Sequence, residues 1–120
     1  MPKATSKITK RAPRKAGREV APSVAYEPWL IEQLKVPAEA AAYLEAIIEE
    51  GDQAALMLAL RQVAQAQGGI AVIARKANLT REATYKMLSK SGNPQLRSLK
   101  ALLAATGLRI AVRPIEKQAA

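Results

Sequence analysis

The sequence predicts an all-α domain of about five helices that ends in one short strand. Apolar residues recur at helical spacing between Pro37 and Thr106, and Gly, Pro and Asn residues divide this stretch into segments of helix length. Within it, Ile70–Asn93 has the pattern of two short helices joined by a tight turn. A chain of 120 residues allows one compact domain with tails.

Residues 1–25 are predicted to form a disordered basic tail. The first 18 residues contain seven Lys or Arg, no acidic residue and little to bury. No apolar run follows these cations, so a secretory signal is not expected, and no window of about eighteen apolar residues predicts a membrane span. The tail could bind nucleic-acid phosphates without sequence preference, or it could only keep the chain soluble.

Residues 26–51 are predicted to hold a docking arm and an acidic helix. The arm, YEPWLIEQLKV, contains three large apolar side chains: Trp29, Leu30 and Leu34. These side chains either cover the chain's own core or dock as an amphipathic peptide on another protein. The helix is expected over Pro37–Glu50, because Pro suits a first helical turn and Gly51 can end a helix.

Residues 52–107 are predicted to form a helix-turn-helix domain. Asp52 can cap a helix over residues 53–67. The next helix, over residues 71–77, leads to Asn78, which takes the left-handed conformation at low cost and so permits a tight turn. The hydroxyl of Thr80 can then cap a helix with an exposed polar face. That face consists of Arg81, Glu82, Tyr85 and Lys86.

The last helix of this domain is predicted over residues 95–106. Asn93 would cap it, Pro94 would open its first turn and Gly107 would close it. Its apolar side chains recur at helical spacing and are expected to be buried. They are Leu96, Leu99, Leu102 and Leu103.

Residues 108–114 are predicted to form the strand, and residues 115–120 a disordered end. Three apolar side chains alternate with Arg109 and Arg113, which is the period of a strand. They are Leu108, Ile110 and Val112. One short strand needs a partner strand, and a second copy of the chain is the best candidate. We therefore expect a homodimer with this strand at its interface, whereas folding back against its own helices is the alternative.

The charge distribution favours a polyanion as partner. Seven acids and the single Lys35 lie between Glu27 and Asp52, whereas eleven basic residues and two acids follow Asp52. A basic carboxyl half that contains an exposed polar helix is typical of nucleic-acid binding. A solvated, Lys-rich surface is the other interpretation.

An enzyme is not expected. The chain has no Cys and no His, so disulfides, thiolate nucleophiles, zinc sites and imidazole bases are ruled out, and an intracellular, cytoplasmic location is expected. Convergent carboxylates and a Gly-rich phosphate loop are also missing from the sequence. We therefore expect no cofactor, no metal and no small-molecule ligand.

The order of these segments resembles that of addiction-module antidote proteins, which are Xre-type antitoxins encoded beside a toxin of the RelE/ParE superfamily. The resemblance covers roughly residues 26–114 and rests on LKVPAEAAAYLEAIIEEGD, ALRQVAQAQGG, IARKANLTREATYKMLSKSGNP and LKALLAATGLRI. The order of the blocks is more specific than any one of them. The resemblance implies a lambda-repressor-like domain of five helices whose recognition helix reads operator DNA. It also implies a ribonuclease toxin as partner.

The resemblance also implies roles for individual residues. It assigns DNA contacts to Arg81, Glu82, Tyr85 and Lys86 at the bases, to Thr80 near phosphate, and to Lys90, Ser91 and Asn93 beside the DNA backbone. The alternative is a solvated helix face with a Glu82–Lys86 pair at i,i+4 spacing. Three departures from the family pattern are Asn78 for a turn glycine, Ala71–Val72 for a Ser-Gln pair, and Thr84 for a leucine. The last of these is expected to loosen packing under the recognition helix.

We therefore expect the antitoxin of a type II toxin–antitoxin module, which also represses transcription from its own palindromic, double-stranded operator. Because a ribonuclease toxin must be basic to hold RNA, the acidic stretch favours docking of the arm on that toxin. Two alternatives remain: a stand-alone Xre-type repressor without a toxin, and a protein-interaction adaptor that does not bind DNA.

Overall fold

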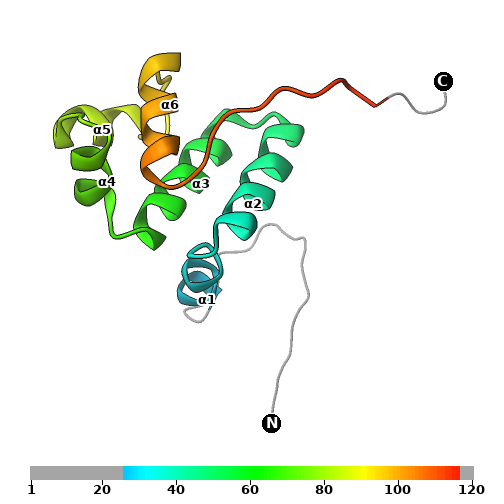
Figure 1. The fold of residues 1–120 in the computed structure, drawn as a ribbon, viewed down its shortest axis with the longest axis horizontal. Coiled ribbons are helices and arrows are strands. Elements are labelled where there is room, and N and C mark those ends of the chain that lie inside the picture. Colours follow the sequence, from blue (N-terminus) through cyan, green and yellow to red (C-terminus); the bar gives the residue numbers. More distant parts are fainter. Residues whose placement is uncertain (1–25, 117–120) are drawn as a thin grey trace, which may run out of the picture.

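In the computed structural model, which describes residues 26–116, the chain forms six helices (Figure 1). Their bounds are α1 Tyr26–Gln33, α2 Pro37–Glu50, α3 Gln53–Ala66, α4 Ile70–Lys76, α5 Arg81–Met87 and α6 Leu96–Ala105. The prediction of an all-α fold is confirmed for these residues. The sixth helix is α1, because the predicted arm is helical over most of its length. The predicted tails at residues 1–25 and 117–120 lie outside the described residues.

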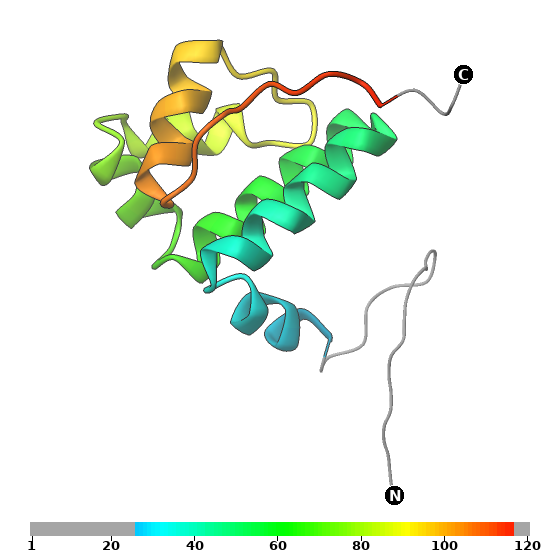
Figure 2. The same cartoon turned by 45° about the vertical axis from the view of Figure 1, so that its right-hand side comes forward.

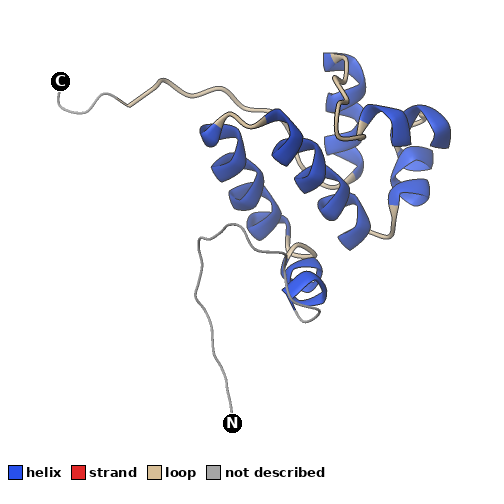
Figure 3. Ribbon diagram, turned by 180° about the vertical axis from the view of Figure 1, so that it is seen from behind, coloured by secondary structure: helices blue, strands red, loops and turns tan. Residues whose placement is uncertain are grey.

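Helix α3 lies at the centre of the fold. It packs against α1, α2 and α4, and it lies between α2 on one side and α4, α5 and α6 on the other (Figures 1 and 3). Most of its apolar side chains are buried: Met57, Ala59, Leu60, Val63, Ala64 and Ala66. Burying a side chain the size of Leu or Met stabilises a fold by about 1.5–3 kcal/mol, so this helix is the main source of core stability.

The carboxyl end of α2 and the start of α3 are set by the two residues between them. Gly51 has a φ of 79°, and its N–H donates to the carbonyls of Ile47 and Ile48 at the end of α2. The side chain of Asp52 then accepts a hydrogen bond from the Ala55 N–H at 3.2 Å. Both features are confirmed predictions. They allow α2 and α3 to turn back on one another over two residues and to pack side by side.

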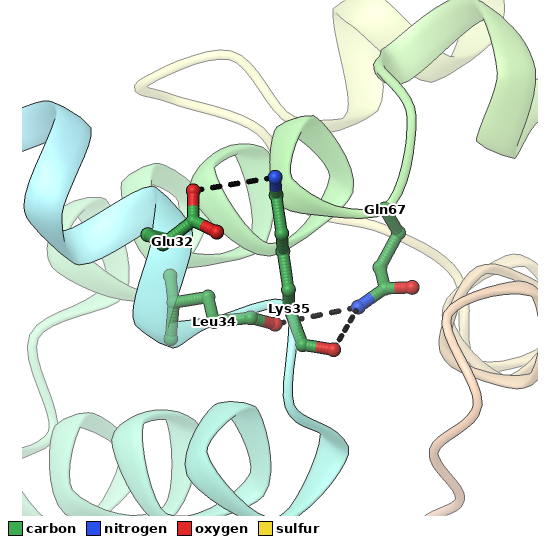
Figure 4. Close-up of polar contacts among 4 residues, drawn as sticks. All are labelled: Glu32, Leu34, Lys35 and Gln67. Atoms are coloured by element: carbon green, nitrogen blue, oxygen red, sulfur yellow. Dashed lines mark hydrogen bonds and ion pairs between the residues drawn. The ribbon is translucent and has the colours of Figure 1, made fainter.

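The turn between α1 and α2 is held by the side chain of the residue that caps the end of α3. Gln67 donates from its Nε2 atom to the carbonyls of Leu34 and Lys35, at 3.3 and 3.2 Å (Figure 4). These carbonyls follow the end of α1 and have no helical partner there, so the amide supplies what the backbone lacks. Lys35 also forms an ion pair with Glu32 at 3.3 Å.

A chain of polar side chains joins α1, α2 and α3. The hydroxyl of Tyr43 donates to Gln62 Oε1 at 2.6 Å, and Gln62 Nε2 donates to Glu27 Oε2 at 3.3 Å. Gln62 is buried, so these bonds satisfy an amide that would otherwise be costly inside the core. Burial raises the pKa of Tyr43 to about 12, with smaller contributions from Tyr26 and Glu27.

The start of α6 differs from the prediction. Helix α6 begins at Leu96, with Gln95 as its N-cap, so Asn93 does not cap it and Pro94 does not open its first turn. Leu96, expected in the core, is 64% exposed. The leucines further along α6 reach the core: Leu99 is partly buried, and Leu102 and Leu103 are buried.

Residues 108–116 form no strand within the described part of the chain (Figure 3). The segment leaves α6 and runs past α3 towards α2 (Figure 2), where Arg113 lies 3.6 Å from Glu45. Leu108 packs partly against the core, and its N–H donates to the Leu103 carbonyl at 2.8 Å. The alternating pattern therefore gives a segment outside any sheet, because a strand requires a partner strand and residues 26–116 supply none.

Tyr43→Phe tests the polar chain between the first three helices. The variant leaves the buried Oε1 atom of Gln62 without its donor, so the free energy of unfolding at neutral pH is expected to fall by about 1–3 kcal/mol. Tyr85→Phe, at an exposed position, is the control and is expected to change little. Denaturant unfolding of the two variants measures the difference.

The same variant tests the raised pKa. An unfolded tyrosine ionises near pH 10, about two units below the folded Tyr43, so the unfolded state releases this proton first as pH rises. The contribution of Tyr43 to the free energy of unfolding is therefore fully present below about pH 10, and it is lost between about pH 10 and 12. Tyr43→Phe should remove this part of the alkaline loss. An alkaline profile identical to that of the wild-type chain would contradict the assignment.

Candidate nucleic-acid interface

The two short helices and the turn predicted between them are present as α4 and α5. Ile73 and Ala74 of α4 are buried, and Asn78 has a φ of 61°, the left-handed conformation expected of it. The Leu79 N–H donates to the Ala74 carbonyl at 2.8 Å across this turn. Asn tolerates this conformation better than most residues with a side chain, so it replaces a turn glycine at low cost.

Helix α5 is fixed at its first turn by two threonines. The hydroxyl oxygen of Thr80 accepts a hydrogen bond from the Ala83 N–H at 3.0 Å, which confirms the predicted cap. Thr84 is fully buried, and its hydroxyl donates to the Thr80 carbonyl at 2.8 Å. The hydroxyl that stands where the family pattern has a leucine therefore has a partner within the helix itself, and Thr84 adds to the packing of α5 through its burial.

The outer face of α5 has the polar surface that the sequence predicts. Its four side chains are all exposed: Arg81, Glu82, Tyr85 and Lys86. The guanidinium carbon of Arg81 lies 5.6 Å from the centre of the Tyr85 ring, which is within the range of a cation–π contact. No Glu82–Lys86 ion pair forms among the described side chains. The first turn of α5 therefore presents an arginine held against an aromatic ring.

A shallow cleft connects this face with the loop before α6. It has a volume of about 510 Å³ and is lined by residues of α5, of the loop and of the first turns of α6. Three of the predicted site residues lie on it, namely Lys86, Ser91 and Asn93, whereas Lys90 is exposed on the same loop. Gln95 and Ser98 also line the cleft, and the sequence did not indicate them because α6 was expected to begin earlier.

Cations dominate the surface of this half of the molecule. From α4 to α6 every Lys and Arg is exposed, and Glu82 is the one acidic residue in that stretch. Four of these cations were not predicted as site residues: Arg75, Lys76, Arg97 and Lys100. Their only signal in the sequence is the excess of basic residues after Asp52. Such a surface attracts a polyanion.

The predicted docking residues separate into two environments. Leu30 and Leu34 are 5% and 1% exposed and belong to the core of the chain itself. Trp29 is 57% exposed, and its ring centre lies 6.0 Å from that of Tyr26. Of the three residues in the arm, a partner could therefore reach Trp29, while the two leucines pack in the core.

The predicted dimerisation residues also differ in exposure. Leu108 is partly buried against the core, whereas Ile110 and Val112 are 42% and 92% exposed. The backbone of residues 110–112 forms no ladder within the described part of the chain. This part of the predicted interface is therefore available to a second chain.

Two further classes of site can be addressed within residues 26–116. No three Asp or Glu side chains lie together in a group that could hold a metal ion. No single helix among these residues has both the length and the apolar composition to cross a membrane. Helices α3 and α4 are long and apolar enough only when taken together, and the angle between them at the break is 86°.

Comparison with known proteins identifies the family. Residues 29–114 match the family model described as "Probable addiction module antidote protein". The chain is 33% identical over 82 residues to an uncharacterized protein of Haemophilus influenzae, and this match covers 68% of the chain and 84% of the relative. No solved structure matches the chain. On the extent of the family match, the chain belongs to the probable addiction module antidote proteins.

Proposed function

We propose that this protein is the antitoxin of a type II toxin–antitoxin module and the autorepressor of its own operator. Its partner would be a RelE/ParE-type ribonuclease toxin, and both would act in the cytoplasm. Membership of the antidote family supports a toxin of some kind as partner. The observation that supports DNA binding is the exposed polar face of α5, which follows a left-handed turn and a threonine cap within a basic half of the molecule.

In this proposal α5 is the recognition helix of a lambda-repressor-like domain and lies in the major groove. Arg81 stands in its first turn, where side chains reach base edges, and a guanidinium can donate two hydrogen bonds to guanine. Its contact with Tyr85 limits its conformers before binding, which lowers the entropy lost on recognition. Glu82 can accept from a cytosine amino group, and Lys86 can contact either a base or phosphate.

The loop before α6 would contact the DNA backbone. Lys90 supplies a charge, and Ser91 and Asn93 supply neutral donors on the same exposed side. Thr80 lies at the start of α5, close to where a phosphate would pass. Phosphate contacts of this kind fix the register of the helix in the groove, while the side chains of α5 select the sequence.

Toxin neutralisation would use the opposite, acidic part of the molecule. Trp29 is an exposed aromatic side chain, a residue type enriched at the centres of protein interfaces. Six acidic residues of α1 and α2 surround it in sequence, against one Lys that is already paired with Glu32. A basic toxin would complement that charge.

Arg81→Ala tests sequence recognition. Its affinity for operator DNA is expected to fall by about 1–3 kcal/mol, with a smaller loss on unrelated DNA. Lys100→Ala removes an equal charge at an exposed position of α6 that is not among the proposed contacts and serves as the control. Binding titrations on both DNAs measure the effect. Equal weakening on the two DNAs would make Arg81 a phosphate contact, and full retention of affinity would exclude it from the interface.

Trp29→Ala tests the docking arm. If the ring fills a pocket of the toxin, truncation should weaken the complex by about 2 kcal/mol or more and impair neutralisation, while operator binding persists. Leu58→Ala, which truncates an exposed apolar residue of α3, outside the acidic helices α1 and α2, is the matched control. Thermal unfolding of the isolated chain provides the counter-test, because a large loss of stability would identify Trp29 as a core residue instead.

Ile110→Pro tests assembly. Two copies paired along residues 108–114 would read a palindrome, and proline removes a backbone donor that such pairing needs. The variant is expected to sediment as a monomer, to keep its helical circular dichroism, and to lose operator affinity by about tenfold or more. Ile115→Pro, just beyond this segment, is the control. A dimer that survives Ile110→Pro would place the interface on the helices.

A further inference from the structure

The loop between α5 and α6 is held by two side chains of α3. Gln53 donates from Nε2 to the Gly92 carbonyl at 3.1 Å, across 39 residues of sequence. Arg61 donates from Nη1 to the Leu88 carbonyl, across 27 residues. The two donors are eight residues apart on α3, so they reach the two ends of the same loop. Neither bond is part of the apolar core.

The loop itself is folded tightly. The Gly92 N–H donates to the Ser89 carbonyl at 2.8 Å, and the Ser89 hydroxyl donates to the Lys86 carbonyl at 2.9 Å. A Cβ atom placed on Gly92 would lie 2.0 Å from the Met87 carbonyl oxygen, so the loop returns directly onto the end of α5. This close approach has no room for a side chain at Gly92, whose carbonyl is then within reach of Gln53.

The two sides of the loop differ in their environment. Leu88 and Gly92, whose carbonyls accept from α3, are buried, whereas Lys90, Ser91 and Asn93 are exposed. The exposed side chains are those proposed above to contact the DNA backbone. Holding the buried carbonyls therefore fixes where the exposed groups point.

We propose that Gln53 and Arg61 are positioning residues for the contact of this loop with DNA phosphates. The inference rests on the proposed DNA-binding function. Without these donors the two carbonyls would bond to water, and the loop would sample several conformers that binding must then order. Arg61 has an additional effect, because its charge lies at the carbonyl end of α5, where a cation is favoured by the helix dipole. Neither residue needs to touch DNA itself.

Gln53→Glu is the main test. It preserves the shape of the side chain but turns the donor atom into a carboxylate oxygen that repels the Gly92 carbonyl. Gln65→Glu adds the same charge at an exposed position of α3 whose side chain makes no bond among the described contacts, so it is the matched control. DNA affinity is expected to fall about three- to tenfold more in Gln53→Glu than in Gln65→Glu.

Two readouts separate positioning from a general loss of stability. Phosphate contacts are independent of sequence, so Gln53→Glu should weaken operator and unrelated DNA by the same factor and make the salt dependence shallower. Both variants should remain folded at the temperature of the DNA titrations, which circular dichroism checks, because both positions are exposed and outside the core. Arg61→Met should produce the same shallower salt dependence, and Arg61→Lys, which restores a cationic donor, should recover part of it.

The outcomes distinguish this inference from the proposed function. If the wild-type chain binds operator DNA but Gln53→Glu and Gln65→Glu share one affinity and one salt dependence, the positioning role is wrong and DNA binding stands. A loss of affinity confined to operator DNA would also overturn it, since that pattern belongs to base contacts. If the wild-type chain binds no DNA, the proposed function and this inference fall together.

Discussion

The burial of α3 is the constraint on which the rest of this structure depends. A helix that packs against α1, α2 and α4 must present apolar side chains over most of its circumference, and α3 does so with Met, Leu, Val and several Ala. The Ala residues let neighbouring helices approach closely. Three polar side chains on α3 form hydrogen bonds with its neighbours: Gln53, Arg61 and Gln62.

The hydrogen bonds made by side chains of α3 and its C-cap fall into two groups. Gln62 and Gln67 bond to α1, α2 and the turn between them. Gln53 and Arg61 bond to the loop before α6. The acidic part of the molecule and the basic part are therefore both hydrogen-bonded to the same helix and its C-cap. Gln53, Arg61 and Gln67 each donate to a carbonyl that lies beyond a helix end, which is where a backbone most needs external donors.

Much of this fold could be predicted from the sequence where the signals are local. The bounds of α2 were predicted at Pro37 and Glu50 because proline and glycine mark both ends, and the conformation of Asn78 followed from its residue type. The start of α6 was predicted wrongly, since the Asn93-Pro94 pair imitates a helix start while the loop is held elsewhere by Gln53. The helical form of α1 was also missed. Its apolar pattern is weak, and the burial of Leu30 and Leu34 against α3 is a tertiary effect.

In the candidate interface, too, the local features could be predicted from the sequence and the tertiary contacts could not. Helical periodicity was sufficient to predict that the polar side chains of α5 share an exposed face. It could not decide between the Glu82–Lys86 and Arg81–Tyr85 pairs, because both have i,i+4 spacing. Gln53 and Arg61 could not be found at all, since the atoms they bond are 39 and 27 residues away. Likewise the alternation after Gly107 indicates an extended segment, but whether it becomes a strand depends on a second chain.

The exposure of the α5 face has an evolutionary consequence. Arg81, Glu82, Tyr85 and Lys86 lie outside the core, so substitutions among them leave the packing of Ile73, Leu88 and Leu102 unchanged. Surface substitutions of this kind usually alter stability by less than about 0.5 kcal/mol. Duplicated copies of this gene could therefore diverge in what α5 recognises one residue at a time, each intermediate remaining folded. The arm has less of this freedom. Trp29 is exposed and could change in the same way, but Leu30 and Leu34 are core residues, and substitutions there would require repacking of the core.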